Sequence, residues 1–148
     1  MISARCLSAF AAVFCLACGG STLADSEAGP TGVWLTPGGN SHVEIAPCGD
    51  KLCGRIVWLK QPNNKKGQPL RDARNEEESL RSRPILGLPL LTGFPQKPTD
   101  GVWDDGRIYS PKTGKTFSSE MEMKGRDTLK VSGCKWIRCR SQIWKRVK

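Results

Sequence analysis

The sequence predicts a mainly β protein, folded as a single small antiparallel up-and-down β-barrel of about seven or eight strands. Two observations lead to this fold class. Short runs rich in β-branched and aromatic residues recur along the chain, and clusters of glycine, proline, asparagine and aspartate separate them. The length of 148 residues suits one domain with one core.

The first half of the predicted barrel contains three strands and two tight turns. The strands are the runs 33–35, 42–45 and 52–59. The turns between them are 37–40, which reads Pro-Gly-Gly-Asn, and 48–50, which reads Cys-Gly-Asp. We therefore expect two consecutive hairpins at the start of the barrel.

The second half continues with strands joined by short connections. A strand at 107–109 is followed by a turn, and further strands are expected at 117–124, at 128–131 and from about residue 139 to 147. The clearest alternation of the chain places Phe117, Met121 and Met123 on one face and Glu120, Glu122 and Lys124 on the other. This pattern predicts strands with one face in a core and one face in solvent.

One segment between these halves has the signals of a short helix. Asn75 is a candidate N-cap, Glu78 follows three residues later as in a capping box, and Pro84 ends the pattern. We expect a helix of one to two turns near one mouth of the barrel. The next apolar run, 85–91, should be an irregular or edge strand, because Pro89 cannot donate a ladder hydrogen bond.

Residues 1–24 have the anatomy of a secretory signal peptide, which leaves residues 25–148 as the folded domain. Arg5 precedes an apolar run that is too short to span a bilayer, and Thr22 and Ala24 fit an A-x-A-like cleavage site. An exported, periplasmic protein is expected, with secretion as a second possibility. In a third reading Cys18 is lipidated, although Cys15 stands where such sites usually have an aliphatic residue.

Four of the seven cysteines remain once the leader is removed: Cys48, Cys53, Cys134 and Cys139. They allow three disulfide connectivities, and the simplest is two local bridges, Cys48 with Cys53 and Cys134 with Cys139, each near turn-forming glycine. Each bridge would contribute about 2 kcal/mol, because the loops it closes are short. Zinc is the alternative, but the spacing is wide for a metal site, and we expect no metal.

Basic residues outnumber acidic ones throughout the chain. Without Arg5, the only charged residue of the leader, 22 basic residues face 14 acidic ones, a net charge of +8. An exported protein with scattered basic residues is not expected to bind nucleic acid. The charge serves either as a solvated surface or as an attraction to anionic lipid headgroups or envelope polysaccharide.

Several motifs resemble those of the DUF2147 family of exported bacterial proteins. They are CGDKLCGRIVWL at 48–59, Asp72 and Asn75, RSRPILGLPLL at 81–91, Trp-x-x-Gly-x-Ile-Tyr at 103–109, GKTF at 114–117 and a terminal GC with CRSQIWKRV. The resemblance covers essentially the whole chain after the leader. It implies a barrel similar to lipocalins (calycins) and implies no catalytic residues, because the function of the family is unknown.

A narrower similarity to lipocalins concerns barrel closure. Gly32-Val33-Trp34 on the first strand resembles their Gly-x-Trp, and Arg146 lies on the expected last strand. Arg146 could pack over the Trp34 indole in a cation–π contact worth about 0.5 to 2 kcal/mol.

The polar residues around the expected helix are the first candidate site. Arg81 and Arg83 could fork onto a carboxylate or phosphate, with Asp72 orienting one of them. In the structural alternative, Asn75 only caps the helix and Asp72 pairs with an arginine to hold it in place.

Aromatic residues expected in the lumen are the second candidate site. They are Trp58, Trp103 and Tyr109, with Phe117 and the two neighbouring methionines. The structural alternative is a filled core, since small barrels can pack their interior with side chains alone.

Two classes of function follow, and neither is enzymatic. The first is a binding module for a small amphiphilic or anionic ligand, and the second is a ligand-free structural or envelope-interaction protein with a packed barrel. Catalysis is not expected, because His42 is the only histidine and no nucleophile can be placed beside it. We expect no cofactor, since no phosphate-cradling or metalloprotease motif occurs.

Overall fold

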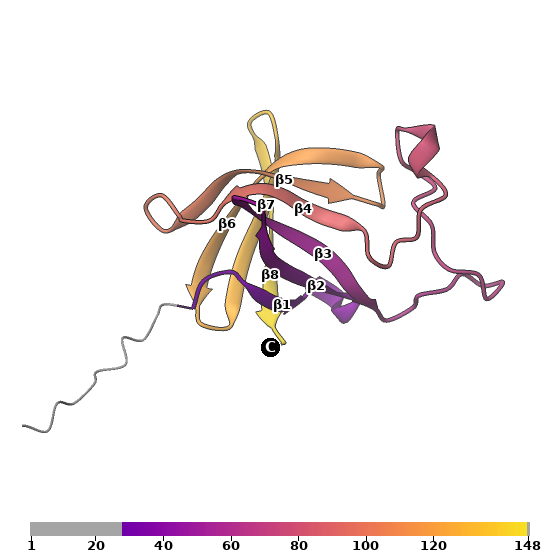
Figure 1. The fold of residues 1–148 in the computed structure, drawn as a ribbon, viewed down its shortest axis with the longest axis horizontal. Coiled ribbons are helices and arrows are strands. Elements are labelled where there is room, and N and C mark those ends of the chain that lie inside the picture. Colours follow the sequence, from indigo (N-terminus) through magenta and orange to yellow (C-terminus); the bar gives the residue numbers. More distant parts are fainter. Residues whose placement is uncertain (1–27, 148) are drawn as a thin grey trace, which may run out of the picture.

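A computed structural model describes residues 28–147, and within them eight antiparallel strands close into a barrel in sequence order (Figure 1). The strands are β1 (Gly32–Leu35), β2 (Ser41–Cys48), β3 (Lys51–Leu59), β4 (Pro89–Pro95), β5 (Val102–Ser110), β6 (Lys115–Gly125), β7 (Thr128–Lys135) and β8 (Arg138–Arg146). Two single-turn 3-10 helices, η1 (Pro37–Gly39) and η2 (Glu78–Leu80), lie between strands. The predicted fold class is confirmed. The leader, including Cys18, lies outside the described residues.

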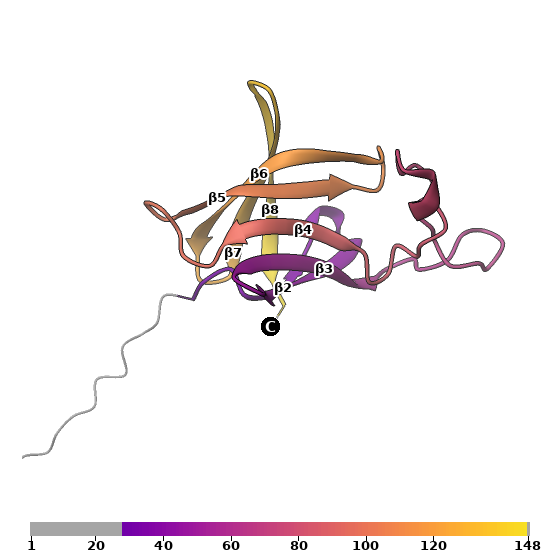
Figure 2. The same cartoon turned by 45° about the horizontal axis from the view of Figure 1, so that its top comes forward.

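The longest connection, residues 60–88, joins β3 to β4 at one end of the barrel. We call this the loop end; it also carries the β5–β6 and β7–β8 turns, while β1 starts and β8 finishes at the opposite end. Figure 2 shows the 60–88 segment extending beyond the ends of β3 and β4, with η2 beside the β5–β6 turn. All the features discussed below as candidate sites depend on this arrangement.

Large side chains fill the barrel interior. The buried hydrophobic residues form one cluster, made of Trp34, Val43, Ile45, Leu52, Ile56, Leu88, Leu91, Phe94, Trp103, Met121, Leu129, Val131 and Trp144. Two inward positions must be glycine: a Cβ at Gly54 would lie 2.9 Å from Leu91, and one at Gly106 would overlap the ring of Phe94. The interior at this level is a packed core.

The apolar run 85–91, predicted as an irregular or edge strand, overlaps β4 only at residues 89–91, and β4 is irregular without being an edge. It pairs with β3 through two register shifts and with β5 at only two positions, Leu91 with Ile108 and Thr92 with Arg107. The prediction of an edge is wrong, because barrel closure gives β4 a neighbour on each side. Pro89 is tolerated because it begins the strand.

The predicted helix is reduced to the single 3-10 turn η2, whose N-cap is Glu77. Asn75 still behaves as a cap would, because its Oδ1 accepts a hydrogen bond from the Glu77 backbone N–H at 2.8 Å. The backbone N–H of Asp72 donates to the carbonyl of Arg83, which ties the two ends of the segment together. The backbone hydrogen bonds inside the segment join residues three apart, as from Leu80 to Glu77 and from Arg81 to Glu78, so it forms a 3-10 turn and not an α-helix.

Both local disulfides are present. Cys48–Cys53 joins β2 to β3 around a two-residue turn that begins at Gly49, where φ is 65°. Cys134–Cys139 joins directly opposed residues of β7 and β8.

The turn of the β7–β8 hairpin differs from the sequence expectation. It is made by Trp136 and Ile137, while Gly133 lies inside β7, where its missing Cβ leaves room for Ile108. The strand therefore runs on to Lys135.

Candidate functional site

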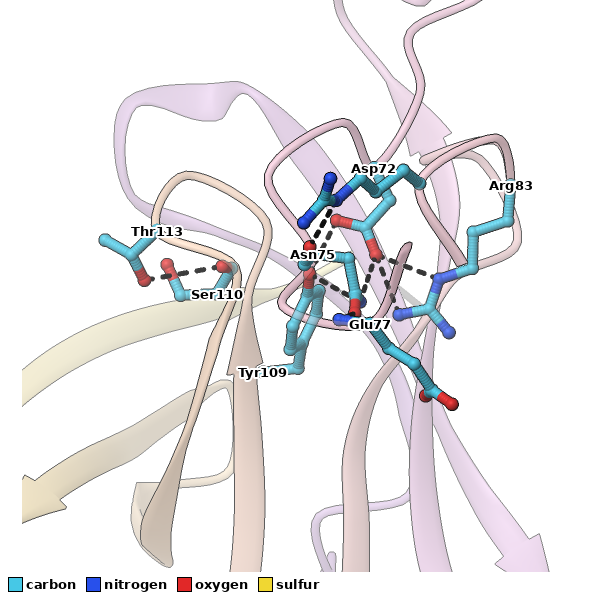
Figure 3. Close-up of polar contacts among 8 residues, drawn as sticks. Asp72, Asn75, Glu77, Arg83, Tyr109, Ser110 and Thr113 are labelled. Atoms are coloured by element: carbon cyan, nitrogen blue, oxygen red, sulfur yellow. Dashed lines mark hydrogen bonds and ion pairs between the residues drawn. The ribbon is translucent and has the colours of Figure 1, made fainter. Parts of the chain in front are cut away.

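The residues around Asp72 form a compact polar cluster at the loop end, drawn in Figure 3. The Asp72 side chain is fully buried, and four donor atoms surround its carboxylate. Tyr109 Oη donates to Oδ1 at 2.6 Å, while Asn75 Nδ2 and Arg83 Nε donate to Oδ2 at 2.8 and 2.9 Å. The Nη2 atom of Arg83 lies 2.8 Å from the same oxygen. The buried charge is thus paired and fully hydrogen-bonded, as burial requires.

The local chain direction explains why these residues meet. Asp72 and Arg83 lie at the two ends of a loop held by their backbone hydrogen bond, and Tyr109 is near the end of β5, beside that loop. Arg74 donates to the carbonyl of Lys112 at 2.6 Å, which fixes the loop to the β5–β6 turn. That turn has Gly114 in a left-handed conformation (φ 72°), directly against the Arg74 backbone.

The cluster changes the titration of Tyr109. Burial, then the hydrogen bond to Asp72 and the negative charge of that carboxylate, raise the pKa of the tyrosine hydroxyl above its ordinary value of 10.0. Hydrogen bonds with Asn75 and Arg83 act in the opposite direction. A neutral Tyr109 at physiological pH is the state that donates to Asp72.

The two arginines predicted to bind an anion, Arg81 and Arg83, make hydrogen bonds to other groups of the protein. Arg83 forks onto Asp72, and its guanidinium also lies 5.4 Å from the centre of the Tyr109 ring. Arg81 Nε donates to the backbone carbonyl of Asn75 at 2.8 Å. The arrangement holds the 60–88 segment against β5, and we call it the latch (Asp72, Asn75, Arg81, Arg83 and Tyr109).

Of the predicted lumen aromatics, Tyr109 belongs to the latch, whereas Trp58 and Trp103 lie elsewhere. Trp58 is 42% exposed on the outer face of β3, with its ring 4.4 Å from that of His42. Its placement in the lumen was wrong, because a β-bulge after His42 shifts the register so that Ile56, not Trp58, faces inward beside Val43. Trp103 is buried at the other end of β5, roughly 20 Å from Tyr109 at about 3.3 Å per residue.

Two hollows lie side by side at the loop end, outside the filled interior. The first, which we call the rim groove, has a volume of about 420 Å³ and is lined by Glu76, Arg107, Lys115, Thr116, Phe117, Ser118, Cys134, Lys135 and Trp136. The second, of about 380 Å³, lies against the latch and shares Glu76 and Thr116 with the first. Its remaining lining includes Glu77, Leu80, Arg83, Leu90 and Tyr109.

The rim groove combines positive charge with aromatic surface. Arg107, Lys115 and Lys135 line it against one carboxylate, Glu76, and Phe117 and Trp136 supply apolar area. Sequence reasoning missed this groove, because the three basic residues come from β5, β6 and β7 and meet only through strand pairing. Finding the rim groove requires the strand register, which pairs Ser118 with Arg107 on one side and with Cys134 on the other.

Within residues 28–147, no helix is both long and apolar enough to cross a membrane. In the same part of the chain, no three histidine, cysteine, aspartate or glutamate side chains gather as metal ligands would.

Comparison with known proteins finds similarity over the whole barrel. Residues 32–146 match the family described as "Uncharacterized protein conserved in bacteria (DUF2147)". Among solved structures, the protein HP1028 from Helicobacter pylori, described as belonging to the lipocalin family, is similar with a TM-score of 0.67 and 20% identity. The similarity covers 80% of this chain and 82% of that one, and at this identity it concerns the fold alone. No curated protein sequence matches.

Proposed function

We propose, for a chain that belongs to the DUF2147 family of bacterial proteins, that it is an exported binding module that holds a small anionic amphiphile in the rim groove. The lipocalin-like barrel serves as a rigid scaffold for this site. The latch keeps the 60–88 segment in place as one wall of the groove, since Glu76 lies within that segment.

The observation that carries this proposal is the charge and chemistry of the rim groove. Three basic side chains, Arg107, Lys115 and Lys135, face a single acidic one, which favours a carboxylate or phosphate. Phe117 and Trp136 on the same lining offer apolar contact to a short hydrocarbon or ring. Pockets of a few hundred Å³ are typical of small-molecule sites.

The packed interior supports a site outside the lumen. Trp34, Phe94 and Trp144 are fully buried in the barrel, and Gly106 leaves room for no more than a hydrogen beside Phe94. A ligand in the lumen would have to displace these side chains, whereas the rim groove needs no such change.

Export is supported by two features of the chain. Both disulfides require an oxidising compartment to persist, and residues 1–24 read as a signal peptide. We propose the periplasm as the location, with anchoring through a lipid on Cys18 as the alternative.

A binding role also agrees with the chemistry available in residues 28–147. His42 stacks on Trp58, away from the rim groove, and the four cysteines of this part are in disulfides. We therefore propose binding without a catalytic step.

Calorimetric titration with octyl phosphate, an anionic amphiphile, tests the proposal. We expect binding that weakens by about fivefold or more in each of Arg107→Ala, Lys115→Ala and Lys135→Ala, because each removes a hydrogen bond to a charged group. Lys51→Ala is the matched control, since Lys51 is exposed on the β2–β3 hairpin at the opposite end of the barrel. Octyl glucoside has the same chain without the charge and should bind more weakly.

Equal affinity for octyl phosphate in the three groove variants and in the control would contradict the proposal.

A second candidate, a ligand-free envelope-interaction protein with a packed barrel, is favoured by the filled interior itself. Native mass spectrometry of protein recovered from its own compartment separates the two candidates, because only a binder should carry a reproducible adduct.

A further inference from the structure

The tip of the β7–β8 hairpin is the most exposed apolar feature among residues 28–147. Trp136 is 92% and Ile137 is 98% exposed, and the two form the whole turn between Lys135 and Arg138. Figures 1 and 2 show this hairpin, in yellow, projecting from the body of the barrel, away from the 60–88 segment. Two large apolar side chains thus form the turn of a projecting hairpin.

The backbone of the turn gives no structural reason for a tryptophan. Trp136 has φ 59°, a left-handed conformation that favours glycine or asparagine and is unusual for a bulky side chain. Its side chain packs against little, as its exposure shows. A tryptophan in a left-handed turn position costs free energy, and no packing inside the fold offsets that cost. Trp136 therefore points to a role in contact with something outside the protein.

The hairpin is also held rigid and surrounded by positive charge. The Cys134–Cys139 disulfide links opposed strands directly behind the tip. Lys135, Arg138 and Arg140 flank the tip and are exposed, and no salt bridge of the described residues includes them. Apolar and aromatic residues at a point, ringed by lysine and arginine, suit the boundary between anionic headgroups and acyl chains.

We propose that the Trp136–Ile137 tip inserts into the headgroup region of an anionic phospholipid bilayer, with the flanking basic residues on the lipid phosphates. This surface shares Lys135 and Trp136 with the rim groove, but membrane insertion goes beyond ligand binding there and does not require it. The protein would touch the membrane by the tip of this one hairpin.

A bilayer fits this tip better than a protein partner does. A tryptophan buries about 150 to 250 Å², so a two-residue point covers far less than the about 1,200 to 2,000 Å² of a specific protein interface. Two side chains on a narrow hairpin can be buried fully only in a surface that they penetrate, such as a bilayer. The positive charge around it selects an anionic surface over a neutral one.

Co-sedimentation with vesicles tests the inference on the domain of residues 25–148. We expect binding to phosphatidylglycerol vesicles and little binding to phosphatidylcholine vesicles. Ile137→Ser should weaken partitioning by about tenfold, and Arg138→Gln by about fivefold. Raised salt should weaken the binding of every variant.

Controls separate this inference from the groove. Ile137 does not line the rim groove, so Ile137→Ser should leave octyl phosphate binding unchanged. Ile143→Ser is the matched control for lost apolar area, because Ile143 is 46% exposed on the same strand but away from the tip. In addition, nitroxide-labelled phosphatidylglycerol should quench a part of the tryptophan fluorescence that Trp136→Phe lacks.

Three results would overturn the inference. They are no binding of the unmodified protein to phosphatidylglycerol vesicles, equal loss of binding in Ile137→Ser and Ile143→Ser, and a self-associated state in solution that Ile137→Ser abolishes without any vesicle binding. The last would assign the tip to a second copy of the chain.

Discussion

The guanidinium of Arg146 lies 4.2 Å from the centre of the Trp34 ring, and the two residues are paired across the junction of β1 and β8. Arg146 also donates to the carbonyls of Gly29, Thr31 and Arg126 at 2.9, 2.7 and 2.9 Å. Because the β1–β8 ladder has only two paired positions, this side chain carries much of the closure of the barrel.

Arg146→Met should lower the free energy of unfolding by about 2 to 4 kcal/mol, because it removes the cation–π contact and leaves three carbonyls without their donor. Arg146→Lys keeps the charge but not the forked guanidinium. Its free energy of unfolding should lie between those of the unmodified protein and of Arg146→Met. Urea unfolding measures both variants. Lys145→Met, at an exposed neighbour on β8, is the control, and an equal effect there would refute the closing role of Arg146.

Asp72→Asn should destabilise the protein by about 3 kcal/mol, because Arg83 then loses the partner of its partly buried charge. Asp127→Asn is the matched control: Asp127 also faces an arginine, Arg146, at 3.5 Å, but its side chain is 72% exposed. There the loss should be less than about 1 kcal/mol. Similar losses for the two variants in urea unfolding would speak against the latch.

Stability should fall at high pH through Tyr109. The pKa of its hydroxyl is raised in the folded state, so the folded protein holds this proton more tightly than the unfolded chain does. The stabilisation is complete below the unfolded pKa of about 10 and is lost as the pH rises through the folded value. Tyr109 is the only tyrosine, so tyrosinate absorbance follows it alone.

Tyr109→Phe supplies the comparison for this pH dependence. The variant should be less stable at neutral pH, because Asp72 loses a donor, and its stability should decline less steeply above pH of about 10. A parallel decline in the two proteins would show that other groups cause it.

Gly106→Ala should destabilise the barrel by about 1 to 3 kcal/mol, because the added methyl group overlaps the Phe94 ring in a packed interior. Gly29→Ala is the control, since nothing lies within 4 Å of a Cβ there. Thermal unfolding compares the two. A neutral effect at Gly106 would mean that the interior has free space.

Most strands and the β2–β3 hairpin were predictable because their signals are local. Alternating residues in β6 and the Gly49 turn between β2 and β3 need no information from distant chain. The inward or outward direction of Trp58 was not predictable, because it depends on a bulge in the pairing of β3 with β2.

The short helix and the sites depended on contacts far apart in sequence. Asn75 makes a cap-like hydrogen bond, but the segment that the Asp72–Arg83 hydrogen bond closes contains only the single 3-10 turn η2. The match over residues 32–146 confirms the family resemblance, and the eight closed strands confirm the barrel that it implied. The tip at Trp136 had a visible signal, two apolar residues where a two-residue turn favours glycine or asparagine, and its meaning needed the hairpin register.

Two ladders of the closed barrel, β1–β8 and β4–β5, have only two paired positions each. Arg146 braces the first, so local opening should begin at the second, the β4–β5 seam, and not at the longer ladders. The hydrogen bond from Tyr109 to Asp72 crosses the seam from outside, since it ties the end of β5 to the segment that leads into β4. The contacts that hold the 60–88 segment therefore also control how often β4 and β5 separate locally. Separation of these two strands would expose the core to solvent.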